Sequence, residues 1–415
     1  MKMFTVTKRI INDSSKFDHI ILGYNIESPN QEYSNVSKVF FKGWVLPRHD
    51  KKAEILIEDN SISQTFPCDV QRDEVTKKIS GQINSNIKCG FHIEWNRIGI
   101  FNISFIVEGE KMLIAEIKIT SHREIEIVGQ ELYRIENSIR DSTSLDKLFE
   151  DLRCCLGLDD FGTLLWSMPN TAYPEMLKIL PKMATDEVQR NWTGNSGTHL
   201  LKQTISFVRS VAHNFCKFYG NTLDNQSILD FGCGYGRIAR LMYYFTSSDN
   251  LFGVDPWDKS IEICHSDGLP ERNFLLSDYL RVDLPTGDRK FALIYAFSVF
   301  THLSKRATIT AIETLLRHLE SRGLLVITIR PVEYWNVDGN AKQLSLVDQQ
   351  ISLHQENGFS FLPHSRPPVD GDITYGSTSM SLNWLKATFP KAEILGVDRS
   401  LNDPLQVYVF LRSLN

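Results

Sequence analysis

One short motif combines a carboxylate with three closely spaced glycines: Asp230 is followed by Gly232, Gly234 and Gly236. Glycine permits positive φ angles and lets a ligand approach the backbone closely. A helical segment begins at Arg237, and the free N–H groups at its start would face a polar or anionic ligand. The dinucleotide pattern GxGxxG is absent, because Arg237 stands where its third glycine would be. The motif therefore predicts a ligand-binding turn of another class.

Two further carboxylates, Asp255 and Asp278, come at the ends of the next two apolar runs. From residue 226 onward, short apolar runs alternate with helical segments, which predicts a parallel sheet. Its first three strands would bring Asp230, Asp255 and Asp278 to the crevice where open α/β sheets bind ligands. There Asp255 can accept both hydroxyls of a ribose, and Asp278 can reach an adenine amino group. An acidic crevice without a phosphate-binding lysine suits a cationic nucleoside, and S-adenosylmethionine fits that description.

Four motifs resemble those of class I S-adenosylmethionine-dependent methyltransferases. Residues 230–236 match the first motif in full, Gly253-Val254-Asp255 matches the second, and Ser277-Asp278 lies at the third. Residues 291–303 resemble the fourth-strand motif, although Ala292 stands where that family usually has an aspartate.

The resemblance covers residues 226–330 and implies a Rossmann-like, seven-stranded methyltransferase sheet. It implies S-adenosyl-L-methionine as the cofactor, with Asp230 and the three glycines beside the methionyl group. By the same resemblance, Asp255 would bind the ribose and Asp278 the adenine.

Two tryptophans are candidates for covering the cofactor. Trp257 lies just past Asp255, where it can either cover the adenine face or pack in the core. Trp192 and Gly194 belong to a polar loop before a helical segment at residue 200. This Trp-Thr-Gly stretch resembles one in methyltransferases of bacterial surface-polysaccharide gene clusters, which implies a lid or a cofactor contact. A simple loop at a helix entry is the alternative.

His302 follows the fourth predicted strand, on the ligand side of the sheet. Transfer of a methyl group to a hydroxyl benefits from a general base, and an ordinary histidine pKa near 6.5 suits that role. A structural hydrogen bond within the turn is the alternative. No cluster of residues with metal-ligand spacing occurs, so no metal is predicted.

An insertion at about 331–390 is longer than a simple crossover requires. Candidate substrate residues are Arg330 at its start and Asp370, Asp372 and Tyr375 within it, because carboxylates beside aromatic rings suit sugar recognition. A plain surface loop is the alternative.

The end of the chain and residues 41–46 loosely resemble enzymes of bacterial O-antigen and capsule gene clusters. The leading hypothesis is therefore O-methylation of a sugar hydroxyl of a bacterial glycan by in-line transfer. The runner-up is methylation of a small metabolite, such as a phenol, acid or amine. A non-catalytic binding module is the alternative of another class, and the intact set of three acidic residues argues against it.

Three segments of the chain differ in pattern. Residues 1–125 carry strand-like runs without intervening helices, which is typical of a β-sandwich-like accessory domain. Residues 126–225 are expected to form a helical linker and cofactor lid, and residues 226–415 the methyltransferase domain. The accessory domain could position a glycan, bind a second copy of the chain or bind a glycan-assembly partner, and its sequence favours none of these.

Composition narrows the class further. The 415 residues include 45 basic and 50 acidic side chains, and this net charge of −5 disfavours nucleic acid as a partner. No run approaches the roughly 18 apolar residues of a transmembrane helix, and the first 17 residues lack the apolar core of a signal peptide. Seven cysteines without a CxxC pair indicate reduced thiols. We therefore expect a cytoplasmic bacterial enzyme.

Overall fold

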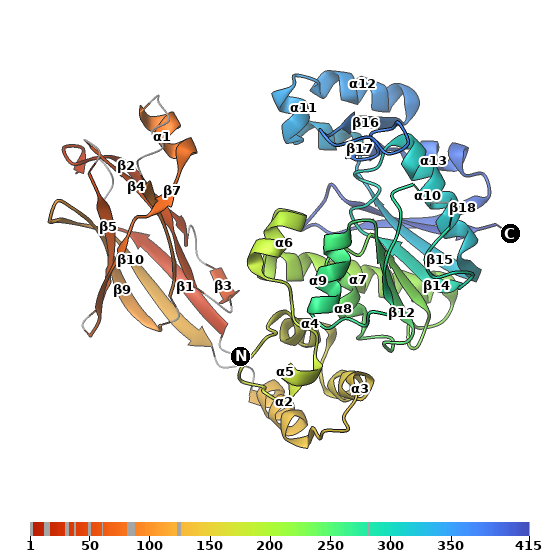
Figure 1. Ribbon diagram of the computed structural model, residues 1–415, viewed down its shortest axis with the longest axis horizontal. Helices are drawn as coiled ribbons and strands as arrows, with labels where there is room; N and C mark the ends of the chain where they lie inside the picture. Colours follow the sequence, from red (N-terminus) through yellow and green to blue (C-terminus); the bar gives the residue numbers. More distant parts are fainter. Residues whose placement is uncertain are drawn as a thin grey trace. The chain divides into compact units, whose positions relative to one another are not determined.

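The computed structural model describes residues 3–11, 17–29, 33–36, 39–48, 51–59, 61–80, 88–95, 97–122, 126–280 and 283–414 (Figure 1). The chain divides into two compact units, Met1–Gln130 and Glu131–Asn415. None of the helices in the described ranges combines the length and apolar composition that a membrane span requires.

The first unit is built from two antiparallel sheets. The larger sheet has the order β3 (Tyr33–Val36), β1 (Met3–Ile10), β10 (Glu110–His122), β9 (Gly99–Val107), β5 (Ala53–Glu58), β6 (Ser63–Pro67). The smaller sheet has the order β2 (Ile21–Ser28), β4 (Phe40–Pro47), β8 (Lys88–Glu94), β7 (Val70–Gln71), and helix α1 (Asp73–Ser80) follows β7. One hydrophobic core draws on both sheets, with Phe41 and Phe91 from the smaller and Ile55 and Phe105 from the larger.

The hairpin between β9 and β10 turns at two residues with positive φ, Glu108 at 53° and Gly109 at 83°. Two consecutive positive φ angles are the signature of a type I′ turn, whose twist matches that of the flanking strands. The sequence predicts this hairpin at the same place.

The second unit begins with a series of helices. They are α2 (Glu126–Ser138, which starts in the first unit), α3 (Leu145–Cys155), α4 (Leu158–Trp166), α5 (Met176–Ile179), α6 (Asp186–Thr193) and α7 (Thr198–Tyr219). Serine or threonine caps begin two of them: the Ser144 hydroxyl accepts a hydrogen bond from the Lys147 amide, and Thr185 caps α6 in the same way. Helix α7 buries Leu201, Ile205 and Val208 on one face, as their spacing predicts.

A mixed sheet of seven strands forms the centre of this unit. Its order is β13 (Phe274–Leu276), β12 (Leu251–Asp255), β11 (Ile228–Phe231), β14 (Phe291–Ala296), β15 (Leu319–Ile329), β19 (Val407–Ser413), β18 (Ala392–Arg399). The first five are parallel, and β19 runs antiparallel to both of its neighbours. Every residue of β12 and β14 is buried, because helices cover both faces of the sheet (Figure 1). The predicted parallel sheet is present, and the antiparallel hairpin of β18 with β19 completes it.

Helices α8 (Arg237–Met242), α9 (Asp258–Ser266) and α10 (Lys305–Arg317) connect successive strands. The sequence predicts that the last of these runs to residue 320 and ends against Gly323, and this prediction is wrong. The helix ends at Arg317, strand β15 already begins at Leu319, and Gly323 lies within that strand. A Cβ at Gly323 would lie 2.9 Å from the Phe291 carbonyl oxygen, so glycine is required here by close approach of two strands.

The insertion after β15 has a small core of its own. It contains η2 (Val332–Asn336), α11 (Gly339–Gln343), α12 (Val347–Asn357), the hairpin of β16 (Phe359–Pro363) with β17 (Gly376–Met380), and α13 (Leu382–Thr388). Trp335 is fully buried in this core, and its indole N–H donates to the Ser379 hydroxyl at 2.7 Å. The start of β17 is joined to the loop after β14, because the Gly376 amide donates to the His302 carbonyl at 2.8 Å. The insertion is therefore fixed against the end of the central sheet.

Candidate active site

A cavity of about 740 Å³ lies at the carboxyl ends of the central strands. Its walls come from the loops after β11, β12, β13, β14 and β15, together with α6, the insertion and the loop before β19. The predicted site residues in its lining are Asp230, Gly232, Gly234, Asp255, Trp257, Asp278, Trp192, His302, Arg330 and Tyr375. Residues far apart in the sequence thus meet where open α/β sheets bind their ligands.

The three motif glycines all have positive φ, but they differ in surroundings. A Cβ at Gly232 would meet Val299 Cγ2 at 2.4 Å, and one at Gly236 would meet Leu269 Cδ1 at the same distance. Gly236 does not line the cavity, so its role here is packing and turn geometry. A Cβ at Gly234 would have only Trp192 Cδ1 nearby, at 3.6 Å. Gly234 is therefore the glycine whose backbone borders open space.

Asp255 holds this loop by its carboxylate. Its Oδ2 accepts a hydrogen bond from the Gly234 amide and its Oδ1 one from the Trp257 amide, both at 2.9 Å. Burial raises the pKa of Asp255, and these two backbone N–H groups oppose that rise. Two carboxylate oxygens offer about four lone-pair sites, so acceptor capacity is left for the hydroxyls of a ribose.

Asp230 is 2% exposed, and its Oδ2 has no hydrogen-bond partner among the described residues. Burial raises its pKa to about 7, while Tyr295 and Arg237 act in the opposite direction. An unpartnered buried acceptor is costly unless a ligand or water satisfies it. Its place in the cavity wall therefore fits the ammonium group of an amino-acid ligand, which would supply both a donor and a positive charge.

Trp192 and Trp257 stack on each other, with ring centroids 4.4 Å apart and an interplanar angle of 19°. The indole N–H of Trp192 donates to the Ser260 hydroxyl at 3.0 Å, which fixes the ring over the glycine loop. One face of Trp257 is thus covered by Trp192, so in this arrangement an adenine can stack only on its other face. Asp278 is exposed and lies on the same side of the cavity, beyond β13.

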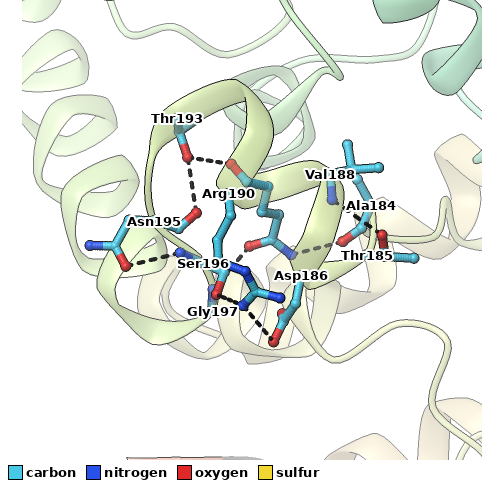
Figure 2. Close-up of polar contacts among 10 residues, drawn as sticks. Ala184, Thr185, Asp186, Val188, Arg190, Thr193, Asn195, Ser196 and Gly197 are labelled. Atoms are coloured by element: carbon cyan, nitrogen blue, oxygen red, sulfur yellow. Dashed lines mark hydrogen bonds and ion pairs between the residues drawn. The ribbon is translucent and has the colours of Figure 1, made fainter. Parts of the chain in front are cut away.

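The segment that carries Trp192 is held together largely by its own hydrogen bonds, as Figure 2 shows for residues 184–197. The buried Gln189 side chain donates to the Ala184 carbonyl at 2.7 Å and accepts from the Gly197 amide at 2.9 Å, so it links both ends of the segment. Gly194 ends α6 in the left-handed conformation and does not line the cavity. Of the two predicted lid residues, Trp192 therefore reaches the cavity, and Gly194 serves as a helix cap.

His302 lines the cavity from the loop after β14, three residues beyond Val299, which packs against Gly232. Its Nδ1 is 2.8 Å from the Gly376 carbonyl oxygen, which it contacts as a donor, and its Nε2 lies 3.4 Å from Arg330 Nη2, from which it accepts. The ring stacks on Tyr375 at 5.0 Å. Burial, and then the Arg330 charge, lower the pKa of His302 to about 3. The imidazole is neutral in this arrangement and is a weak base.

Of the four predicted substrate residues, the structure places two in the cavity, Arg330 and Tyr375. Asp370 and Asp372 do not line it. Asp372 accepts a hydrogen bond from the Ser304 hydroxyl at 2.9 Å, and Asp370 forms an ion pair with Arg306 at 3.7 Å. Both carboxylates are thus used to fasten the loop of the insertion.

Several cavity residues escape prediction from sequence. Arg237 is buried and donates to Gln203 Oε1 at 2.9 Å, and the Gln203 amide donates to Asp403 at 2.7 Å. Gln406 is buried in the lining, and its Oε1 has no partner among the described residues. Only Arg237, which directly follows the glycine motif, had a local signal; the others come from α7 and the loop before β19. In the described ranges, no group of three or more His, Cys, Asp and Glu side chains is arranged to hold a metal ion.

Comparison with known proteins identifies the central part of this unit. Residues 228–323 match a family described as "Methyltransferase domain", whereas a search of curated proteins gave no match. Among solved structures, an S-adenosylmethionine-dependent methyltransferase from Clostridium acetobutylicum is 12% identical, covering 55% of this chain and 97% of that chain at a TM-score of 0.36. Magnesium protoporphyrin IX methyltransferase from Synechocystis, solved with bound S-adenosylhomocysteine, is 16% identical. The match covers 55% of this chain and 94% of that chain at a TM-score of 0.35. At such scores these likenesses support no inference about substrate.

The family match covers the glycine motif, Asp255 and the fourth strand together with its loop. Residues 228–323 are therefore a methyltransferase domain, and the protein is a methyltransferase of class EC 2.1.1 whose methyl donor is S-adenosylmethionine.

Proposed function

We propose that this methyltransferase transfers the methyl group to a hydroxyl of a sugar in a bacterial glycan. The observation that carries the proposal is a single cavity with two unlike halves. The half around Asp230 and Asp255 is acidic and suits the donor, while the half formed by the insertion presents the rings of Tyr334 and Tyr375. These rings are covered by the guanidinium groups of Arg330 and Arg366 and by His302, and the N–H groups of the two arginines can donate hydrogen bonds to sugar oxygens, which supports a carbohydrate at that end.

The donor supplies a methyl carbon made electrophilic by positive sulfur. With both ligands bound, the acceptor oxygen would form a bond to this carbon as the C–S bond breaks. The electron pair of the C–S bond would stay on sulfur, and the hydroxyl proton would leave the acceptor. The residues of this chain have to align the two groups, exclude water and take the proton. Trp192 covers the donor half of the cavity, and the insertion closes the acceptor half.

Two groups in the cavity lining are candidates for taking the proton. His302 is the base proposed from sequence, and its Nε2 must be freed from Arg330 before it can act. Asp403 is the second candidate, because burial raises the pKa of its carboxyl and so makes it a better base than an ordinary aspartate. Substitution separates the two candidates, because only replacement of the residue that acts as the base should lower turnover by about 10²- to 10⁴-fold.

The test is transfer of an isotopically labelled methyl group from S-adenosylmethionine to glycans of lysed bacterial cells, followed by mass spectrometry. The proposal expects label on a carbohydrate oxygen, and Asp403→Asn and His302→Gln then identify the base. Label found only on phenols, acids or amines would favour methylation of a small metabolite instead. Absence of transfer to any acceptor by a protein that binds the donor would refute the carbohydrate proposal.

A further inference from the structure

The two halves of the cavity differ in charge. Asp230, Asp255, Asp278 and Asp283 lie in its lining on the side of β11, β12 and β13. The buried Arg237 also lies on that side, whereas the opposite side, beyond β14 and β15, contains Arg330, Arg366 and Asp403. The acidic side suits a cationic donor, and the side with Arg330 and Arg366 suits an acceptor that carries negative charge.

Arg330 directly follows β15, and its guanidinium lies over the Tyr334 ring, 3.9 Å from the centroid. Its two hydrogen bonds go to neutral groups, the Thr301 carbonyl at 3.1 Å and His302 Nε2 at 3.4 Å. A guanidinium has five N–H donors, so three remain without a hydrogen-bond partner among the described residues. Within those residues Arg330 also forms no ion pair, although it is half-buried in the cavity wall.

Arg366 lies in the cavity lining near Arg330. It is exposed, and its guanidinium lies 4.3 Å from the centroid of the Tyr375 ring, within the range of a cation–π contact. It likewise forms no ion pair in the described part of the chain. Stacking on a tyrosine holds a guanidinium plane while leaving its edge free, and that edge is the part that binds carboxylate or phosphate oxygens.

Two acidic residues lie close enough to act on the charge of Arg330, Asp338 and Asp403, but their side chains are bound elsewhere. Asp338 accepts hydrogen bonds from the Tyr334 and Ser377 hydroxyls and from the Ala341 amide, and it is absent from the cavity lining. Asp403 does line the cavity, but it is bound to Gln203. Asp338 and Asp403 thus offset part of the Arg330 charge, but within the described residues neither forms an ion pair with Arg330 or Arg366, so both guanidinium groups keep N–H donors for an anion.

We propose that the acceptor is an anion, and that Arg330 binds its carboxylate or phosphate group while Arg366 attracts it at the cavity wall. This inference rests on the proposed function and narrows it to an acidic or phosphorylated sugar. A bidentate contact with Arg330 would also orient the acceptor hydroxyl beside His302, because the two side chains are in contact.

The experiment measures binding of glucose, glucuronate and glucose 6-phosphate to the full chain saturated with S-adenosylhomocysteine, by calorimetry. We expect at least one of the two anions to bind ten times more tightly than glucose, and the better of them distinguishes carboxylate from phosphate. Arg330→Gln should raise the Kd for that anion about 10- to 100-fold, the range for loss of a charge-assisted hydrogen bond. Arg366→Gln, at an exposed position, should weaken it less and tests the idea independently of folding.

Arg209→Gln is the matched control, because this exposed arginine pairs with Asp159 and does not line the cavity. Equal affinity for glucose and both anions, no binding of any of the three, or losses no larger in Arg330→Gln and Arg366→Gln than in the control would overturn the inference. Failure of S-adenosylhomocysteine itself to bind would instead overturn the use of this cavity by the donor, so the two failures can be told apart.

Discussion

Gly234→Ala separates the cost of backbone strain from the loss of ligand space. Gly234 has a φ of 54°, and a Cβ there would have only Trp192 Cδ1 within 4 Å, at 3.6 Å. The substitution should therefore cost about 1–2 kcal/mol of stability, the penalty of a left-handed conformation for an L-residue. In the complex, the added methyl group would occupy space that the donor needs, and overpacking of this kind costs about 1–3 kcal/mol. The Kd for S-adenosylhomocysteine should then rise by about 5- to 150-fold.

Gly287→Ala provides the matched control. Gly287 has a φ of 62° and nothing within 4 Å of the added carbon, and it does not line the cavity. Both variants should lose similar stability in thermal denaturation, but calorimetry should show weaker ligand binding only in Gly234→Ala. Gly234→Val, with a larger side chain, should abolish binding. Equal Kd values for Gly234→Ala and the control would refute the idea that the ligand approaches this backbone.

Three further predictions concern other parts of the cavity. Asp255→Asn leaves only one acceptor oxygen for the two amides that bind this carboxylate, so the Kd for S-adenosylhomocysteine should rise about 10- to 100-fold. Asp249→Asn, an exposed position, is its control, and a change within twofold would contradict the ribose-site assignment. Trp192→Ala removes the ring stacked on Trp257 and should raise the KM for the donor about 3- to 10-fold, whereas an unchanged KM would exclude a lid role. Because the pKa of His302 is about 3, its ring stays deprotonated above pH 5, and the NMR signals of this imidazole should not titrate between pH 6 and 8; titration near 6.5 that is lost in His302→Gln would contradict this environment.

The predicted site residues that line the cavity share a simple geometry. Asp230 and Asp255 end parallel strands, and the topology of such a sheet takes strand ends to one crevice whatever the details of packing. Arg330, which the sequence places at the start of the insertion, reaches the cavity because it directly follows β15. Hydrophobic runs predict the positions of strands well, so residues at the ends of strands can be placed from sequence as well as the strands themselves.

Glycines and loops were harder to interpret, because one residue type serves several purposes. Gly194 and Gly236 were expected at the cofactor, yet a positive φ is needed equally by a helix cap and by a packed turn. Asp370 and Asp372 have a composition that suits sugar binding, but the same carboxylates fasten the loop to Ser304 and Arg306. The role of such a residue depends on which side chains it contacts. Because these partners are distant in the sequence, the local pattern does not reveal them.

The contact between Arg330 and His302 joins the two open questions about the acceptor and the base. In the free enzyme, the Arg330 charge helps to lower the pKa of His302 and its guanidinium occupies Nε2. An anionic group bound to Arg330 would offset that charge, and a nearby opposite charge favours the protonated imidazolium. Binding of an anionic acceptor should therefore raise the basicity of His302 at the moment a hydroxyl proton has to be removed. A neutral acceptor gives no such gain, so the pairing favours methylation of charged sugars through their kcat as well as their affinity.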